Sequence, residues 1–379
     1  MTESTNDLLP VGLSDRLPRE AAIATHAMRA VLVAMDAHGF DRVRPPLVEF
    51  EKSMAERMAK NGEGVSPRRM FRFVDPVSLR MMALRSDMTV QVGRIAATSL
   101  VAAPRPLRLC YAGEVATITS DQLDPARQRL QLGAELIGSD TVEAAAEIVV
   151  LAIESLKAAG ASGISVDFTL PDLVDTLAKD TMPLAEDQIA SVRRELDTKD
   201  AGGLKAAGGE AYLPLLYATG AFDRAIEKLA AIDAGGALSS RIDGLKSIAT
   251  RISGPNAQVE ARVTLDPTER HGFEYQSWFG FTIYAEGARG ALGRGGTYSI
   301  SGADEPATGF SLYLDSLIDA LDDAGERKTV YLPLGHDPKV AAELRRAGWR
   351  TVAALSDSDD PEALGCTHLL DGAEPRDLA

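Results

Sequence analysis

Hydrophobic residues near the start of the chain recur every three or four positions. They predict a helix whose first turn holds Pro18, a residue suited to that position, with Ser14 and Asp15 just before it as candidate caps. Gly39 closes the segment, as glycine commonly does after a helix. Residues 40–44 then predict a strand, which two prolines end. The helix is defined by apolar positions Ile23, Ala27, Val31, Ala34 and Met35.

The next hundred residues carry mainly strand patterns. Residues 67–80 predict a hairpin with its turn at Asp75, and residues 84–95 lead into a helix. Residues 107–117 and 129–137 read as strands, and the polar stretch between them favours an antiparallel pair.

Helical patterns dominate the middle of the chain. One helix is expected from Asp140, with Glu143 in capping-box position, to about Ala159. Residues 171–253 are rich in Ala, Lys, Asp and Glu and predict a helical insertion, whereas residues 262–284 return to strands.

The remaining segments complete an α+β pattern. Gly293–Tyr298 predicts a tight glycine turn, residues 310–321 predict a helix, and residues 329–355 predict a short β-α-β unit. We therefore expect a core domain at residues 1–327 and a small α/β piece at residues 328–379.

The strand pattern at residues 129–136 separates polar from apolar positions. Because side chains alternate across a strand, Gln131, Gly133 and Glu135 share one face with Arg129. Glycine in a strand admits a close approach to the backbone, so this face is a candidate binding surface for a polar ligand. A sheet with one solvated face is the alternative explanation. The opposite, apolar face carries Leu130, Leu132, Ala134 and Leu136.

Composition narrows the class of protein. The chain has 379 residues, with 40 Lys and Arg against 55 Asp and Glu, so its formal charge is −15. Such a charge provides no bulk attraction for nucleic acid or an anionic membrane. Two distant cysteines fit a reducing compartment and exclude a disulfide scaffold. Without an 18-residue apolar run or a signal-peptide pattern, we expect a cytoplasmic protein with no membrane span.

The usual motifs of independent catalysis are missing from the sequence. There is no phosphate-loop pattern, no dinucleotide-binding glycine pattern and no G-x-S-x-G segment. The five histidines lack metal-ligand spacing. We therefore expect no metal, no cofactor and no catalytic residues.

Six blocks in this order resemble the catalytic domain of histidyl-tRNA synthetases, which are class II aminoacyl-tRNA synthetases. Residues 39–46 are similar to the dimer-forming first motif, and residues 84–89 to the L-R-P-E-G-T segment. Residues 109–135 are similar to the second motif, including its Q-x-G-x-E strand. The resemblance covers roughly residues 8–325 except the insertion, and implies a homodimer and an antiparallel sheet flanked by helices. The last three blocks are residues 272–275, 293–298 and 309–312.

The sequence departs from that family where the nucleotide is handled. Two arginines hold the ATP phosphates in class II enzymes, and Thr117 and Ser316 occupy their positions here. Each lost donor to a developing phosphoryl charge costs about 3 kcal/mol, so adenylation should be negligible. In addition, only about 50 residues follow Arg327, too few for an anticodon-binding domain.

These features together resemble the regulatory subunits of ATP phosphoribosyltransferase, a family related to histidyl-tRNA synthetases. The resemblance implies that the partner is the short-form catalytic subunit, in a hetero-octamer of four plus four. It also implies a role in the first step of histidine biosynthesis, inhibition by L-histidine, and no binding of tRNA.

The resemblance implies a histidine site built from the retained polar residues. Asp87, Thr89 and Gln131 would accept from the ligand's ammonium group, and Glu135 would accept from one imidazole nitrogen. The other nitrogen would meet Tyr275 or Gln276, and the ligand carboxylate would use Arg270 or, less favourably, His271.

Two other functions fit the same residues. One is a divergent ligase that activates an amino acid for an acceptor other than tRNA, and the other is a free histidine-binding module. A ligase should keep cations at positions 117 and 316, and a module should lack a partner. A third possibility is that the polar positions are inherited scaffold that binds nothing.

Overall fold

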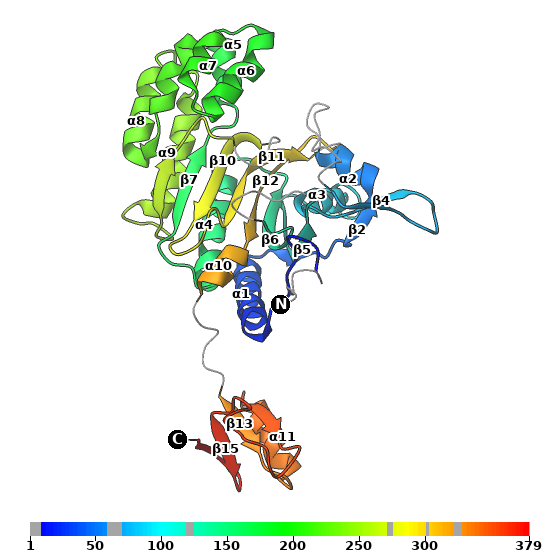
Figure 1. The fold of residues 1–379 in the computed structure, drawn as a ribbon. Helices are drawn as coiled ribbons and strands as arrows, with labels where there is room; N and C mark the ends of the chain where they lie inside the picture. The colour runs from blue at the N-terminus through cyan, green and yellow to red at the C-terminus, as the bar shows by residue number, and fades with distance from the viewer. Residues whose placement is uncertain are drawn as a thin grey trace, which may run out of the picture. The chain divides into compact units, whose positions relative to one another are not determined.

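The computed structural model divides the chain into two compact units, Met1–Leu321 and Asp322–Ala379, and each is described by itself. Figure 1 shows the ribbon with its element labels. The described residues are 9–58, 70–118, 125–270, 276–300, 303–321 and 328–378.

The larger unit is built on a sheet with the strand order β1-β5-β6-β12-β11-β10-β7-β9-β8 among the described residues. Neighbouring strands are antiparallel, except that β1 is parallel to β5 and β7 to β9. The prediction that β5 and β6 form an antiparallel pair is confirmed. The bounds are β1 Asp41–Arg42, β5 Leu107–Ala116, β6 Gln128–Ile137, β7 Ser165–Thr169, β8 Gly220–Ala221, β9 Arg262–Leu265, β10 Gln276–Tyr284, β11 Gly293–Ile300 and β12 Glu305–Tyr313.

Two long helices, α1 (Pro18–Ala37) and α4 (Val142–Ala158), pack against each other and the sheet. Their predicted lengths are confirmed, but both predicted caps are wrong. The residue before α1 is Leu17, which makes no side-chain cap, and Thr141 rather than Asp140 caps α4 by accepting from the Ala144 amide. Both corrections are shifts of a few residues, the usual uncertainty at helix ends.

A small antiparallel sheet adjoins the core in the order β2-β4-β3, and it confirms the predicted hairpin. Asp75 holds its turn, accepting from the backbone amides of Val77 and Ser78. The helix predicted after residue 84 is α3, confirmed at Thr89–Ala97. The other bounds are β2 Val48–Phe50, α2 Glu51–Met58, β3 Arg72–Val74 and β4 Met81–Leu84.

The segment 171–253 is helical as predicted, apart from the short strand β8 that joins the main sheet. Its helices gather at one end of the larger unit (Figure 1), where α9 packs on α4. They are α5 Leu173–Asp180, α6 Glu186–Asp197, α7 Ala201–Ala206, the 3₁₀ helix η3 Glu210–Tyr217, α8 Phe222–Ile232 and α9 Ser239–Ser253.

Two sequence predictions near the end of the core are wrong. Residues 293–298 form a strand, β11, paired on both sides with β10 and β12, instead of a tight turn. Phe310 lies in β12, and the helix expected from it is only α10, Asp315–Ala320. The strand predicted near the start of the chain, at residues 40–44, is shorter than expected, because only Asp41–Arg42 pair with β5.

The smaller unit contains the predicted β-α-β pattern, with β13 parallel to β14. A second pair, β15 and β16, extends this sheet on its other side. Val330, Leu332, Ala341, Leu344 and Leu370 make its apolar core. The bounds are β13 Thr329–Leu332, α11 Pro338–Arg346, β14 Arg350–Ala353, β15 His368–Asp371 and β16 Glu374–Asp377.

Candidate functional site

The polar face of β6 lies inside the protein. Gln131 is fully buried and Glu135 is 1% exposed, although β6 carries polar residues at alternate positions. The alternative of a solvated sheet face is therefore excluded. Buried polar groups need hydrogen-bond partners, and the neighbouring strands supply them.

Two tyrosines hold the Glu135 carboxylate. The Tyr111 hydroxyl donates to Oε1 at 3.0 Å, and the Tyr298 hydroxyl donates to Oε2 at 2.7 Å. Burial raises the pKa of the Glu135 carboxyl to about 8, even though both tyrosine hydrogen bonds act in the opposite direction. The group is therefore poised between its neutral and charged forms near physiological pH.

A second set of hydrogen bonds connects β6 to the start of α3. The Gln131 side chain donates from Nε2 to Asp87 Oδ1 at 2.7 Å, and its Oε1 accepts from the Met88 amide at 2.9 Å. Asp87 Oδ1 also accepts from the Thr89 amide at 2.9 Å. The four predicted residues Asp87, Thr89, Gln131 and Glu135 therefore lie in one network.

Tyr111 and Ser311 join the two halves of that network. The Tyr111 hydroxyl lies 2.9 Å from Thr89 Oγ1 and 3.0 Å from Ser311 Oγ, and Ser311 Oγ accepts from Gln131 Nε2 at 2.8 Å. Burial, followed by the carboxylates of Glu135 and Asp87, raises the Tyr111 pKa well above its usual value. The polar cluster is Asp87, Thr89, Tyr111, Gln131, Glu135, Tyr298 and Ser311.

Sequence reasoning gave no ligand role to Tyr111, Tyr298 or Ser311. Tyr111 also explains Gly133, since it lies directly opposite that glycine and a Cβ at position 133 would overlap its hydroxyl. The group that closely approaches the backbone at Gly133 is therefore the Tyr111 hydroxyl of the protein itself, rather than a ligand. A polar residue opposite a strand glycine would have indicated Tyr111 as a member of the site. Recognising it requires the register of β5 against β6, which the sequence does not give.

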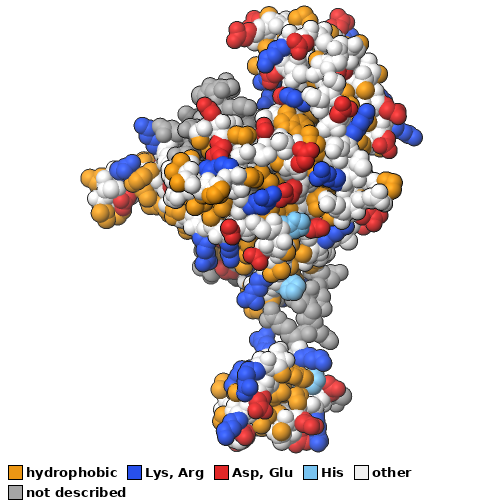
Figure 2. All heavy atoms as spheres, turned by 180° about the vertical axis from the view of Figure 1, so that it is seen from behind, with side chains coloured by type: hydrophobic (Ala, Val, Ile, Leu, Met, Phe, Trp, Pro, Cys, Tyr) orange, Lys and Arg blue, Asp and Glu red, His pale blue; other side chains and the backbone are white. Residues whose placement is uncertain are grey.

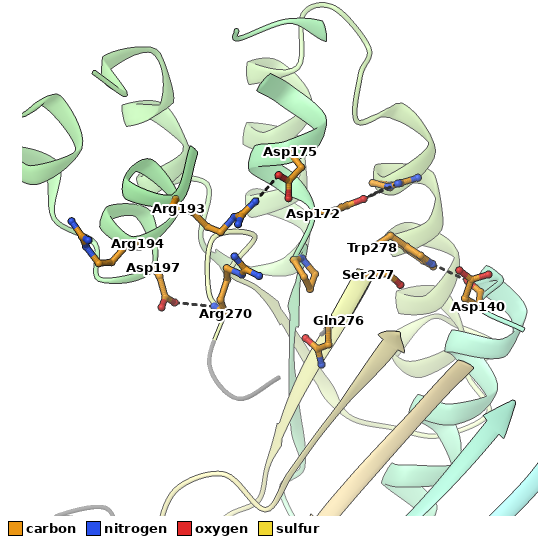
Figure 3. Close-up of a pocket in the computed structure, with 13 residues that line it drawn as sticks. Asp140, Asp172, Asp175, Arg193, Arg194, Asp197, Arg270, Gln276, Ser277 and Trp278 are labelled. Carbon is orange, nitrogen blue, oxygen red and sulfur yellow. Dashed lines mark hydrogen bonds and ion pairs between the residues drawn. The ribbon is translucent and has the colours of Figure 1, made fainter. Parts of the chain in front are cut away.

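The remaining predicted residues border a larger space. A cavity of about 790 Å³ lies between the insertion helices and β10 (Figure 3). Arg270 and Gln276 line it, while His271 and Tyr275 lie outside the described residues. The other lining residues are Asp140, Pro171, Asp172, Asp175, Ala190, Arg193, Arg194, Asp197, Arg241, Ser277 and Trp278.

Opposite charges are paired around this cavity. Arg241 contacts Asp172 at 2.7 Å and Arg193 pairs with Asp175. The neutral backbone amide of Arg270 donates a hydrogen bond to the Asp197 carboxylate at 2.9 Å. Figure 3 shows Asp175 and Arg193 on the helices, Arg270 on a loop beside them, and Gln276 on β10 below. With four arginines and four aspartates, the lining suits a zwitterion better than a strongly charged ligand.

The space beside Glu135 is much smaller than this cavity. Its volume is about 10 Å³, and Gln276 borders it as well as the larger cavity, whereas Arg270 borders the larger one alone. About 10–15 Å³ is the lower limit for a single water molecule. The predicted residues are therefore divided between the polar cluster and the cavity, with Gln276 between them.

Two further properties hold for the part of the chain that the structure describes. No group of three or more His, Cys, Asp or Glu residues is arranged to hold a metal ion. None of the helices in this part has the length and hydrophobicity needed to cross a bilayer.

Comparison with known proteins assigns the family. The family model of histidyl-tRNA synthetase matches residues 12–317. Two curated relatives, from Rhodospirillum centenum (39% identical, 98% of this chain and 96% of the relative) and Paramagnetospirillum magneticum (40%, 98% of each), are ATP phosphoribosyltransferase regulatory subunits. The chain belongs to the ATP phosphoribosyltransferase regulatory subunit family. This assignment confirms the resemblance drawn from the sequence blocks.

Solved structures agree on the fold of this regulatory subunit family. A Bacillus halodurans protein titled ATP phosphoribosyltransferase regulatory subunit/histidyl-tRNA synthetase superposes with a TM-score of 0.79 at 22% identity, covering 96% of this chain and 97% of its own. Histidyl-tRNA synthetase from Nostoc superposes at 0.77 and 17% identity, covering 97% and 91%. The predicted class II synthetase-like α+β fold is confirmed.

Proposed function

We propose that the chain is a non-catalytic regulatory subunit of an ATP phosphoribosyltransferase and that its polar cluster binds free L-histidine. The family assignment over nearly the whole chain supports the first statement. The observation that carries the second is Glu135, a fully buried carboxyl at the end of a chain of hydrogen-bonding groups. Burying such a group is costly, and a ligand that pairs with it offsets part of that cost.

The chemistry of histidine matches the groups in the cluster. An imidazole offers a donor and an acceptor, and Glu135 can accept from the donor when it is ionised. The ammonium group of an amino acid has three donors, and Asp87 and Gln131 provide acceptor oxygens at the other end of the cluster. Arg270, on the cavity side, provides a cation for the ligand carboxylate.

The absence of adenylation is part of the same proposal. Position 117 holds a threonine whose backbone amide donates to the Arg127 carbonyl at 2.8 Å, and position 316 holds a serine within α10. Neither side chain carries the charge that phosphate oxygens need. Histidine that binds without being adenylated would act as a regulatory ligand rather than as a substrate.

We also propose that the chain forms a homodimer and then a hetero-octamer with the short-form catalytic subunit. Large exposed apolar side chains are concentrated within residues 9–118, which hold α1 and the β3–β4 hairpin. Figure 2 shows hydrophobic atoms gathered on the projecting hairpin. Contiguous exposed apolar surface commonly marks a protein interface. The exposed apolar residues in this range are Leu9, Val11, Leu17, Val33, Leu47, Phe73, Val74, Val77, Leu79, Met81, Val101 and Ile118.

Calorimetric titration and light scattering test the proposal. Isothermal titration with L-histidine should show micromolar binding, and Glu135→Ala should abolish it. Multi-angle light scattering with and without the catalytic subunit should give the hetero-octamer and the homodimer. The absence of heat in the wild-type protein would contradict the histidine site, and a lone dimer in the mixture would contradict the assembly.

A further inference from the structure

Three glycines lie side by side across the sheet, in the row that begins at Glu135. Gly309 of β12 is directly opposite Glu135, Gly296 of β11 is opposite Gly309, and Gly280 of β10 is opposite Gly296. Opposite residues of antiparallel strands share a face of the sheet. The three glycines therefore form a strip of that face without side chains of its own, here named the glycine floor.

Three side chains lie over the glycine floor, and one of them, Thr169, lies at the Gly280 end only, where a Cβ would be 2.5 Å from its Oγ1. The Glu135 carboxylate covers Gly309, where a Cβ would overlap Oε2. The Gln276 amide covers the other two positions: a Cβ at Gly280 would lie 2.5 Å from Oε1, and one at Gly296 would lie 2.9 Å from Nε2. The register of β10 against β11 is irregular between Gln276 and Gly280, the stretch over which the Gln276 side chain reaches back toward the floor.

The Gln276 side chain is held in this position by a hydrogen bond from Nε2 to the Gly295 carbonyl at 2.8 Å. It borders both the space of about 10 Å³ beside Glu135 and the cavity of about 790 Å³ beyond. A five-membered ring cannot enter the smaller space as it stands, whereas the larger cavity has ample room. A ring that reaches Glu135 over the glycine floor must replace the Gln276 amide.

We infer that Gln276 is a gating residue between the cavity and Glu135. The ligand enters from the cavity, the Gln276 side chain leaves the glycine floor, and a flat nitrogen-containing ring takes its place. The glycines let the face of this ring lie on the backbone, and its edge then meets the Glu135 carboxylate. The identity of the ring as imidazole rests on the proposed function, but the gate itself rests on the geometry of the floor.

Binding kinetics test the gate directly. Trp278 lines the cavity, and the chain's second tryptophan, Trp349, can be removed by Trp349→Phe so that Trp278 alone reports binding. In stopped-flow mixing with L-histidine, the observed rate should reach a plateau as concentration rises, because opening limits entry. Gln276→Ala should raise that limit about tenfold or more, the factor that corresponds to about 1.4 kcal/mol.

Gln258→Ala is the matched control, because it makes the same substitution at an exposed residue that lines neither the cavity nor the space beside Glu135. Its rates should equal those of the parent protein. Unchanged rates in Gln276→Ala, with histidine bound at equilibrium in both proteins, would overturn the gate and leave the proposed function standing.

A second measurement needs no bound ligand. A water-soluble carbodiimide with glycine ethyl ester modifies protonated carboxyl groups, and peptide mass spectrometry follows Glu135 alone. Gln276→Ala should increase the rate of this modification about tenfold, whereas Gln258→Ala should not change it. Equal rates in all three proteins would overturn the gate, whether or not histidine binds.

Discussion

The Glu135 carboxylate occupies the space that a side chain at position 309 would need. A Cβ atom built on Gly309 would overlap Glu135 Oε2 and would also lie 2.8 Å from the Ala134 carbonyl. Both residues are on central strands, β6 and β12, where the backbone has little freedom to move away. A glycine here is a condition for a buried carboxyl at position 135.

Gly309→Ala should therefore displace Glu135 and weaken the fold. We expect a loss of about 1–3 kcal/mol in the free energy of unfolding, the usual cost of overpacking, and histidine affinity reduced more than tenfold. Urea unfolding and calorimetry check the two effects. Gly202→Ala is the control, because its Cβ would meet nothing closer than 3.3 Å. Equal free energies of unfolding for Gly309→Ala and wild type would contradict the prediction, since they would show that the backbone shifts to accommodate the added methyl group.

Tyr298→Phe should raise the pKa of Glu135 further, because the Tyr298 hydrogen bond lowers it in the intact protein. The carboxyl then titrates above about 8, as followed by carbon NMR of labelled glutamate. Tyr284→Phe, outside the polar cluster, should leave the titration unchanged. A lower pKa in Tyr298→Phe would contradict the assignment of the hydrogen bond.

The stability of the folded protein should depend on pH through Glu135. Its pKa is about 8 when folded and near 4.5 when unfolded, so between these values the folded chain binds more protons. The free energy of unfolding therefore falls as pH rises from about 5 to 8, and the contribution is fully present only below about 4.5. Urea unfolding across this range should show the fall in wild type and a flatter profile in Glu135→Gln. Parallel profiles would contradict the buried titration.

Charge introduced at the hairpin tip should separate the homodimer. Val77 is 91% exposed and Leu79 is 77% exposed, so Val77→Asp with Leu79→Asp should leave the monomer's unfolding unchanged. Light scattering should then show dissociation at micromolar concentration. Leu355→Asp, equally exposed at 91% but in the C-terminal unit, is the matched control. If the double variant remains a dimer, the hairpin tip is not part of the homodimer interface.

Histidine-dependent exchange of pyrophosphate into ATP should be absent from the purified protein. Thr117 and Ser316 offer no cation to phosphate oxygens, and each missing donor costs about 3 kcal/mol of transition-state stabilisation. A radiolabel exchange assay with an active histidyl-tRNA synthetase as positive control checks this. Measurable exchange would support the ligase alternative instead.

Local patterns predicted much of the secondary structure but only Gln131 and Glu135 of the seven residues in the polar cluster, whereas Asp87 and Thr89 came from the resemblance to histidyl-tRNA synthetases. Period-two alternation was enough to place Gln131 and Glu135 on one face, because a strand fixes the direction of each side chain. The segment Gly293–Tyr298 was read wrongly for the opposite reason. Its glycines resemble a turn, but their cause is non-local: a Cβ at Gly293 would overlap Leu312, one at Gly295 would overlap Phe281, and one at Gly296 would crowd the Gln276 amide.

Tyr111 and Tyr298 illustrate the same limit. Nothing in their own segments indicates a shared partner, since they come from strands β5 and β11 on either side of β6 and β12. Only the register, with Tyr111 opposite Gly133 and Tyr298 opposite Ala307, brings both hydroxyls to one carboxylate. Alternation within one strand carries no information on which strands meet.

The two tyrosines that hold Glu135 also make the pairing of four strands mutually dependent. A slip of one residue in β5, β6 or β11 would turn a phenol or the carboxyl to the opposite, apolar face and leave the others without partners. Misaligned sheets are therefore penalised by buried polar groups as well as by lost packing. The residues proposed to bind histidine thus also select the correct alignment during folding. A variant of them that fails to bind histidine should be checked for strand misalignment before its defect is assigned to a lost ligand contact.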